Sequence, residues 1–191
     1  MKTLKYTIEF HTYWHCGSGL AAGADVDALV IKDKNEMPYI PGKTIKGLMR
    51  EAVEEIISLR PDRMNEEEYL KVFGYLDDGG SEKKEVEMKK SESFFTNANL
   101  VEYKEIVKDK LQRFLLTSIS STAIDSDGIA KDHSLRKMQV VVPCKLSGEI
   151  INVPDGMVSL LSDAAKFIKN MGVNRNRGLG RCTINVEEAT V

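Results

Sequence analysis

The sequence predicts an α+β fold of the ferredoxin-like plan, βαββαβ, in which two helices cover one face of an antiparallel sheet. Three observations predict it. Apolar and polar residues alternate near the N-terminus, two later stretches carry apolar residues at helical spacing, and a further β-like segment lies near the C-terminus. A length of 191 residues with 42% hydrophobic residues suits one domain over residues 1–191, with insertions.

The first strand and the first helix have clear patterns. Residues 3–13 alternate between apolar and polar side chains, which is typical of a half-buried strand. After a glycine-bearing loop, the short apolar run 26–32 fits either a buried strand or an ordered loop. Pro41 and Gly42 then open a helix that ends near Arg60. Its apolar stripe comprises Ile45, Leu48, Met49, Ala52, Val53, Ile56 and Ile57.

A short helix and a charged insertion follow. Residues 65–73 predict the helix, because Asn65 is a good N-cap, acidic residues fill the first turn and Gly74 ends the pattern. The stretch at about 77–90 is acidic and glycine-bearing with little apolar content, so we expect an exposed insertion. Residues 94–101 resume as a strand.

The second half of the chain predicts a hairpin, a helix and a last strand. Two β-like stretches, 115–123 and 138–146, flank a polar segment, so we expect a β-hairpin at about 121–138 that projects from the body. Pro154 opens another amphipathic helix, and residues 182–186 form the terminal strand.

Charge is distributed unevenly along the chain. The net charge is -2, but residues 51–110 hold 16 acidic against 10 basic residues, whereas residues 131–181 hold 9 Lys or Arg against 4 Asp or Glu. The basic part of the chain is therefore the part that could face phosphate. Apolar runs stay well below the roughly 20 residues of a membrane span, and the start lacks the pattern of a signal peptide. We therefore expect a cytoplasmic protein that does not associate with membranes.

Three segments carry residues suited to RNA chemistry. Residues 172–181 combine glycines with Arg175, Arg177 and Arg181, and Gly178 and Gly180 let a backbone approach a polyanion closely. The alternative is an ordinary surface turn. In residues 41–50, Lys46 and Arg50 lie four apart on one helix face, near amides that favour phosphate. A nucleotide P-loop is excluded there, because position 37, where its first glycine would fall, is Met37.

The third segment, residues 24–33, contains Asp25 and Asp27, which in the alternative interpretation only cap a loop. With the polar hairpin segment 121–130, these motifs resemble, in order, those of the RAMP superfamily, the CRISPR-associated RNA-binding proteins. The likeness is to the backbone subunit of type III effector complexes. It extends from Tyr6 to Val186 apart from the insertion, and it implies a ferredoxin-like, RRM-like domain whose hairpin is a thumb.

The resemblance also implies partners and site residues. The partners are guide RNA, target RNA, further copies of the chain and other effector subunits, and the thumb displaces a target nucleotide at regular intervals. Asp27 is implied to be catalytic in target RNA cleavage and to hold a divalent metal, Mg²⁺ or Mn²⁺. Residues implied to contact RNA are His15, Lys46, Arg50, Lys131, Arg136, Arg175, Arg177, Gly178, Gly180 and Arg181.

The chain departs from the family pattern at one position, and two other functions stay open. Ser126 stands where the family commonly has Arg, so a guide contact there is in doubt, although Lys131, Arg136 and Lys137 can substitute. One alternative is a scaffold that binds guide RNA without cutting. The other is a guide-processing endoribonuclease with His15 as general base, although 191 residues leave little room for the two halves that such enzymes have.

Overall fold

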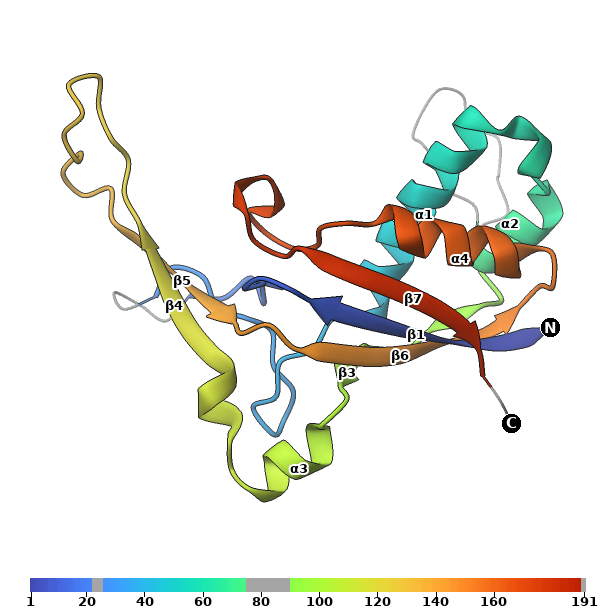
Figure 1. Ribbon diagram of the computed structural model, residues 1–191, viewed down its shortest axis with the longest axis horizontal. Helices are drawn as coiled ribbons and strands as arrows, with labels where there is room; N and C mark the ends of the chain where they lie inside the picture. The colour runs from blue at the N-terminus through green and yellow to red at the C-terminus, as the bar shows by residue number, and fades with distance from the viewer. Residues whose placement is uncertain (22–25, 75–89, 190–191) are drawn as a thin grey trace.

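The computed structural model describes residues 1–21, 26–74 and 90–189 and contains an antiparallel main sheet (Figure 1). Its long strands are β1 (Lys2–Phe10), β6 (Lys145–Val153) and β7 (Cys182–Glu188). The order is β2-β6-β1-β7, where β2 is Phe94–Phe95, and the two-residue strand β3 (Asn99–Leu100) also pairs with β6. This order is the one that the βαββαβ plan requires, so the predicted α+β fold is confirmed.

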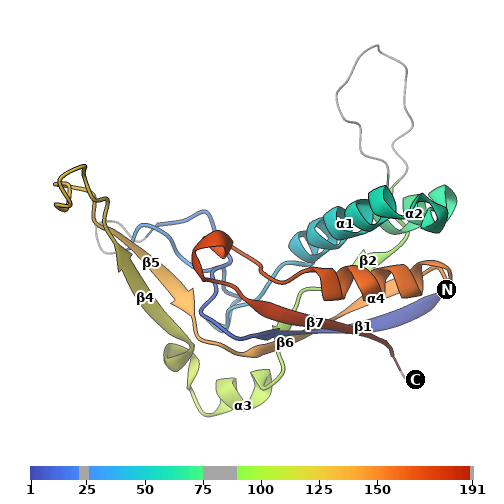
Figure 2. The same ribbon diagram turned by 45° about the horizontal axis from the view of Figure 1, so that its top comes forward.

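Two helices cover one face of this sheet. The helices α1 (Gly42–Leu59) and α4 (Met157–Phe167) pack against each other, and both lie on the same side of the sheet (Figure 2). Alternation in β1 sends Leu4, Tyr6 and Ile8 into the core, where none of them is exposed. The alternating pattern therefore identified both the strand and its buried face.

The end of α1 and the next helix follow the sequence signals. A 3₁₀ turn (Pro61–Arg63) leads to α2 (Glu66–Phe73), whose N-cap Asn65 accepts a hydrogen bond from the Glu68 amide. Gly74 ends α2 with a positive φ of 75°, and its N–H donates to the Leu70 carbonyl. None of the helices in the described ranges is long and apolar enough to cross a membrane. The insertion expected at about 77–90 lies outside the described residues, apart from Lys90.

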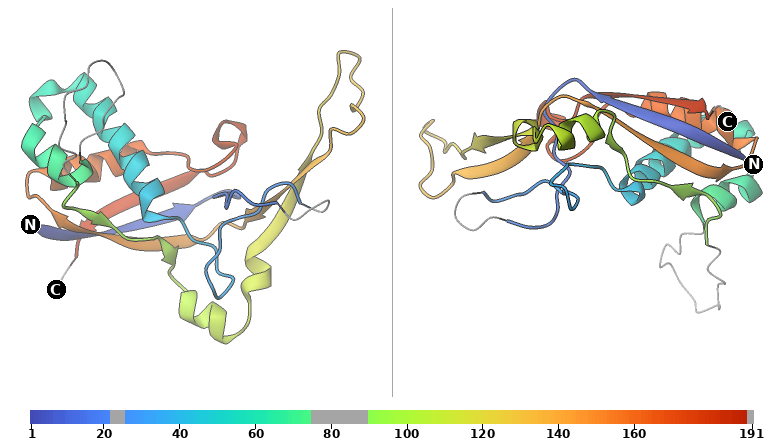
Figure 3. Two further views of the ribbon diagram at one scale, coloured as in Figure 1. Left: turned by 180° about the vertical axis from the view of Figure 1, so that it is seen from behind. Right: turned by 90° about the horizontal axis from the view of Figure 1, so that it is seen from below.

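The hairpin forms a small sheet of its own. Its strands are β4 (Leu116–Ser121) and β5 (Arg136–Val141), and it extends away from the main sheet at the end opposite the N-terminus (Figure 3). The stretch 138–146, predicted as one strand, is divided between β5 and β6. Pro143 lies in the break and cannot donate a ladder hydrogen bond, which explains the division.

Several short elements differ from the prediction. Residues 94–101 form β2 and β3 rather than one strand. Of the two structures expected for residues 26–32, the ordered loop is the one found, and isolated bridges hold it. The six-residue helix α3 (Tyr103–Lys108) and the 3₁₀ turn Gln112–Leu115 were not predicted. Stretches this short carry too little periodicity to indicate their structure.

Candidate nucleic-acid cleft

A cleft of about 590 Å³ lies where three separate segments meet. These are the loop that holds Asp27, the base of the hairpin, and the glycine-rich loop before β7. The lining residues are Asp27, Ala28, Ile119, Ser121, Arg136, Lys137, Met138, Val173, Asn174, Arg177 and Leu179. The fold thus brings together three residues that the sequence singled out separately, Asp27, Arg136 and Arg177.

Asp27 is fixed to strand β5 by two hydrogen bonds. Its N–H donates to the Lys137 carbonyl at 2.8 Å, and its Oδ2 accepts from the Lys137 N–H at 2.7 Å. Ala28 then bridges Met138 in parallel, and the Gln139 N–H donates to the Ala28 carbonyl. The carboxylate is therefore exposed but oriented, with Oδ1 left without a hydrogen bond from the described residues.

The glycine-rich loop reaches the cleft through a tight backbone path. Asn174 and Gly178 flank a 3₁₀ turn (Arg175–Arg177) and both have positive φ, 57° and 86°. Gly180 also has positive φ, and a Cβ there would lie 1.8 Å from the Met171 carbonyl oxygen. The loop therefore needs glycine at position 180 for both reasons. Of its arginines, Arg177 lines the cleft, whereas Arg175 and Arg181 are exposed outside it.

His15 joins the glycine-rich loop to strand β5 from inside the protein. The residue is 2% exposed, and its Nδ1 lies 2.6 Å from the Gln139 carbonyl oxygen, so Nδ1 carries the hydrogen. The His15 carbonyl in turn accepts from the Val173 N–H. A ring buried in this way offers no face for base stacking, so the structure gives no support to the RNA contact expected for His15.

Lys46 and Arg50 lie on α1, outside the cleft. The Lys46 ammonium donates to the Ser91 hydroxyl, and Arg50 donates to the Phe73 carbonyl at 2.6 Å while its guanidinium lies 5.7 Å from the Phe73 ring centroid. The Arg50 Nε is buried and has no hydrogen-bond partner among the described residues. These contacts conflict with an open phosphate-holding surface at these two residues.

The first amide of α1 is also occupied. The Gly42 N–H donates to the Asn97 side chain, and a Cβ on Gly42 would lie 2.0 Å from the Phe95 carbonyl oxygen. Lys131, by contrast, is exposed in the segment between β4 and β5 and does not line the cleft. Its expected contact with RNA stays a prediction.

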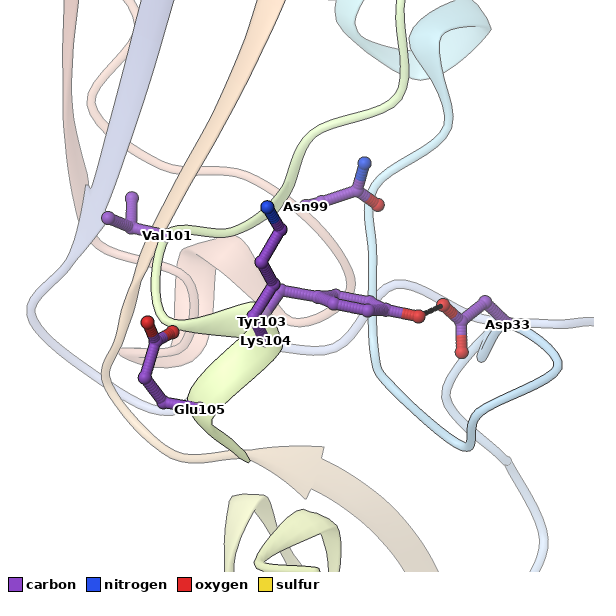
Figure 4. Close-up of a pocket in the computed structure, with 6 residues that line it drawn as sticks. All are labelled: Asp33, Asn99, Val101, Tyr103, Lys104 and Glu105. Carbon is purple, nitrogen blue, oxygen red and sulfur yellow. Dashed lines mark hydrogen bonds between the residues drawn. The ribbon is translucent and has the colours of Figure 1, made fainter. Parts of the chain in front are cut away.

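A second hollow of about 480 Å³ lies beside α3 (Figure 4). Its polar groups bond to one another: the Tyr103 hydroxyl donates to Asp33, and the Asn35 amide donates to the Tyr103 oxygen. Burial acts to raise the pKa of Asp33, but hydrogen bonds from Tyr103 and from the Met37 and Asn35 amides outweigh it and lower that pKa. This network anchors α3 to the turn after Asp33 and leaves the cleft as the better candidate site.

The cleft offers one carboxylate as a metal ligand, so its residues could hold a metal ion only together with other ligands. No group of three or more His, Cys, Asp or Glu side chains among residues 1–21, 26–74 and 90–189 is placed so that it could hold a metal ion. Asp27 is the sole carboxylate among the lining residues, and its Oδ1 is available. One carboxylate suits Mg²⁺ when phosphates and water supply the other ligands. The residues therefore fit a cation shared with RNA, and not one held by the protein alone.

Sequence reasoning missed part of the cleft. It did not assign a role to the apolar residues Ile119, Met138, Val173 and Leu179, or to Asn174. The only usable signal was the proximity of Asn174 and Leu179 to the arginines of the same loop. Apolar residues in strands are ordinarily read as core, so the half-exposed Met138 gave no signal.

Comparison with known proteins identifies the class. The model of the RAMP superfamily matches residues 7–183, so the chain belongs to that superfamily. A chain of type III-B Cmr-beta bound to cognate target RNA shares the fold with a TM-score of 0.70 at 10% identity, covering 97% of each chain. A chain of the apo state of type III-B Cmr-beta has a TM-score of 0.66 at 12% identity, covering 99% of this chain and 98% of that one. No curated protein matches the sequence.

Proposed function

We propose that this chain is an RNA-binding backbone subunit of a type III CRISPR ribonucleoprotein, and that its cleft cuts target RNA paired to the guide. The observation that carries the proposal is the meeting of Asp27 with Arg136, Lys137 and Arg177 in one cleft. Membership of the RAMP superfamily and the likeness to Cmr-beta bound to target RNA support it. The partners would be guide RNA, target RNA, further copies and other effector subunits, in the cytoplasm.

The cleft suits cleavage by the RNA's own 2′-hydroxyl. The cations Arg136, Lys137 and Arg177 hold the scissile phosphate, and Arg offers paired donors to its oxygens. Asp27, oriented by the Lys137 amide, accepts the hydrogen of the 2′-hydroxyl and directs that oxygen at the phosphorus. The new O2′–P bond forms as the bond to the 5′-oxygen breaks. The leaving 5′-oxygen takes a proton from solvent water, and Asp27 returns its proton to solvent, which leaves a 2′,3′-cyclic phosphate and a 5′-hydroxyl.

A divalent cation would be held by Asp27 and RNA phosphate oxygens. When bound, it supplies charge neutralisation on the phosphate. The protein's own contribution, orientation of the 2′-hydroxyl and positioning of the phosphate, depends on hydrogen bonds that the structure already contains.

The test is Asp27→Asn in the complex assembled with guide RNA. Asn keeps an oxygen that accepts from the Lys137 amide, so the loop stays in place while the charge is lost. We expect cleavage of complementary RNA to fall at least a hundredfold with near-normal target binding, consistent with the 10²–10⁴-fold typical of one acid–base group. The matched control is Asp109→Asn, an exposed carboxylate next to α3, which should cut at the parental rate.

Other results of this experiment lead to other functions. Unchanged cleavage by Asp27→Asn would make the chain a scaffold that binds guide RNA while another subunit cuts. If Asp27→Asn weakens target binding while bound target RNA is still cleaved at the parental rate, Asp27 serves assembly of the complex and not cleavage.

A further inference from the structure

The Asp27 loop, residues 26–32, runs alongside strand β5 as a short parallel partner. Ala28 bridges Met138 in parallel, and the Gln139 N–H donates to the Ala28 carbonyl at 3.0 Å. In a regular parallel pair, the next bond of this ladder would run from the Val30 N–H to the Gln139 carbonyl. The loop therefore begins a ladder with β5 whose next acceptor is the main chain of Gln139.

The main-chain carbonyl of Gln139 is already occupied. His15 donates to it from Nδ1 at 2.6 Å. The Val30 N–H donates instead to Oε1 of the Gln139 side chain, at 3.3 Å. The side-chain amide thus replaces the acceptor that His15 has taken, and Gln139 serves both neighbours at once.

The Val30 amide depends on this side chain. Val30 is 2% exposed, and its N–H has no other acceptor among the described residues. A buried N–H without an acceptor is unfavourable, so the loop would leave β5 to bring this N–H to water if Oε1 were removed. Asp27 lies in the same loop and its carboxylate accepts from the Lys137 N–H of β5, so its orientation depends on that attachment.

We propose that Gln139 is a positioning residue for RNA cleavage, which acts through Asp27 by completing the ladder between the Asp27 loop and β5. Gln139 does not line the cleft, so this role does not require contact with RNA. The inference rests on the proposed function, because it concerns the orientation of the group that accepts the 2′-hydroxyl hydrogen. It also specifies the side chain: position 139 needs a hydrogen-bond acceptor at the reach of Gln.

The experiment measures single-turnover cleavage of complementary RNA by the complex assembled with guide RNA. Gln139→Met keeps the length of the side chain and removes its oxygen acceptor, whereas Gln139→Asn keeps the amide on a side chain too short to reach Val30. We expect each change to slow cleavage of bound target by roughly tenfold or more, because slight misplacement of a catalytic group has effects of this order.

Two variants serve as controls for these losses. Gln139→Glu restores an oxygen acceptor at the reach of Gln, so it should cleave close to the parental rate. Gln112→Met makes the same exchange as Gln139→Met in the 3₁₀ turn before β4, outside the cleft, and should also cleave at the parental rate. If Gln139→Met does not assemble, the comparison of Gln139→Asn with Gln139→Glu decides the question.

Two further measurements separate positioning from a general loss of structure. Affinity for a target that carries 2′-deoxyribose, and so cannot be cut, should be the same in the parent and the variants, because Arg136 and Arg177 are unchanged. In the Asp27→Asn background, Gln139→Met should slow the residual cleavage no further, because the group that it positions is already gone.

The proposal and the proposed function fail in different ways. Parental cleavage by both Gln139→Met and Gln139→Asn would overturn the positioning role, as would rate losses that multiply in the double variant with Asp27→Asn. Failure of Gln139→Glu to restore cleavage would also overturn it, because the acceptor would then not be what matters. Parental cleavage by Asp27→Asn alone would instead overturn the proposed function.

Discussion

At the scale of single residues, burial separates structural roles from contacts with RNA. His15 and Arg50 were both singled out as RNA contacts from the sequence, yet each bonds a backbone carbonyl inside the protein. A linear motif reports residue type and spacing, but not the direction of the side chain. That direction depends on packing between segments that are distant in the sequence, such as His15 against Gln139.

We expect His15→Phe to lower the free energy of unfolding by about 1–3 kcal/mol, because the part-buried Gln139 carbonyl loses the hydrogen bond from the buried His15 ring. Urea denaturation measures the change. The control is His11→Phe. The His11 side chain forms a hydrogen bond with the Thr183 hydroxyl at the exposed surface, so its replacement should lower the free energy of unfolding much less. A direct RNA contact by His15 would show the opposite pattern, with weaker RNA binding and unchanged stability.

The two glycines of the Arg-Gly-Leu-Gly-Arg stretch should differ in their tolerance of a side chain. Gly178→Ala should cost about 1–2 kcal/mol of stability, because its φ is 86° but no atom lies within 4 Å of the added Cβ. Gly180→Ala should cost more, since its Cβ would also displace the Met171 carbonyl. Thermal melts of the two variants make the comparison. Equal losses would show that only backbone strain matters in this loop.

At the scale of elements, periodicity predicted the long segments well. The strand β1 and the helices α1, α2 and α4 each have a continuous pattern of buried positions, and the structure places them within a few residues of their predicted ends. The division between β5 and β6 at Pro143 was missed, because both parts are apolar and the sheet to which each belongs is decided by its partner strand.

The Arg50 side chain on α1 contacts the end of α2. Its hydrogen bond to the Phe73 carbonyl satisfies the last turn of α2, and its guanidinium lies over the Phe73 ring. We expect Arg50→Met to reduce the free energy of unfolding by about 1.5–3 kcal/mol, the range for a hydrogen bond to a charged group. Lys43→Met, at an exposed position on the first turn of α1, is the control and should be nearly neutral.

The salt dependence of RNA binding distinguishes this role from phosphate binding. If Arg50 contacts RNA, its replacement lowers the salt slope of binding; if it holds α2, the slope is unchanged while stability falls. A lowered slope with unchanged stability would contradict the structural role.

At the scale of the whole molecule, the net charge does not describe the charge of the cleft. The net charge is -2, yet the cleft places Arg136, Lys137 and Arg177 around a single carboxylate. Sequence analysis anticipated a basic second half of the chain. It could not assign Arg177 rather than Arg175 or Arg181 to the cleft, because that choice depends on how the 3₁₀ turn orients each side chain.

We expect Arg177→Gln to lower the slope of log K against log salt by about 0.7–0.9, the loss of one phosphate contact. Binding of guide-complementary RNA at several KCl concentrations provides the slope. The control is Arg60→Gln, an exposed arginine after α1 that pairs with Asp62 outside the cleft. An unchanged slope for Arg177→Gln would remove the glycine-rich loop from the interface.

Because the hairpin forms a sheet of its own, the two sides of the cleft are held by different parts of the fold. Strand β5 is held to the body at Gln139 and Val141, by His15 and Trp14, and beyond these points it continues outward as part of the hairpin. Asp27 bonds to Lys137, just outside this pivot, whereas Arg177 is on the body side. The Asp27 carboxylate is therefore bonded to the outgoing part of β5, whereas Arg177 belongs to the loop before β7. The two sides of the cleft are held by different parts of the fold, so the angle at which the hairpin leaves the body sets the width of the cleft.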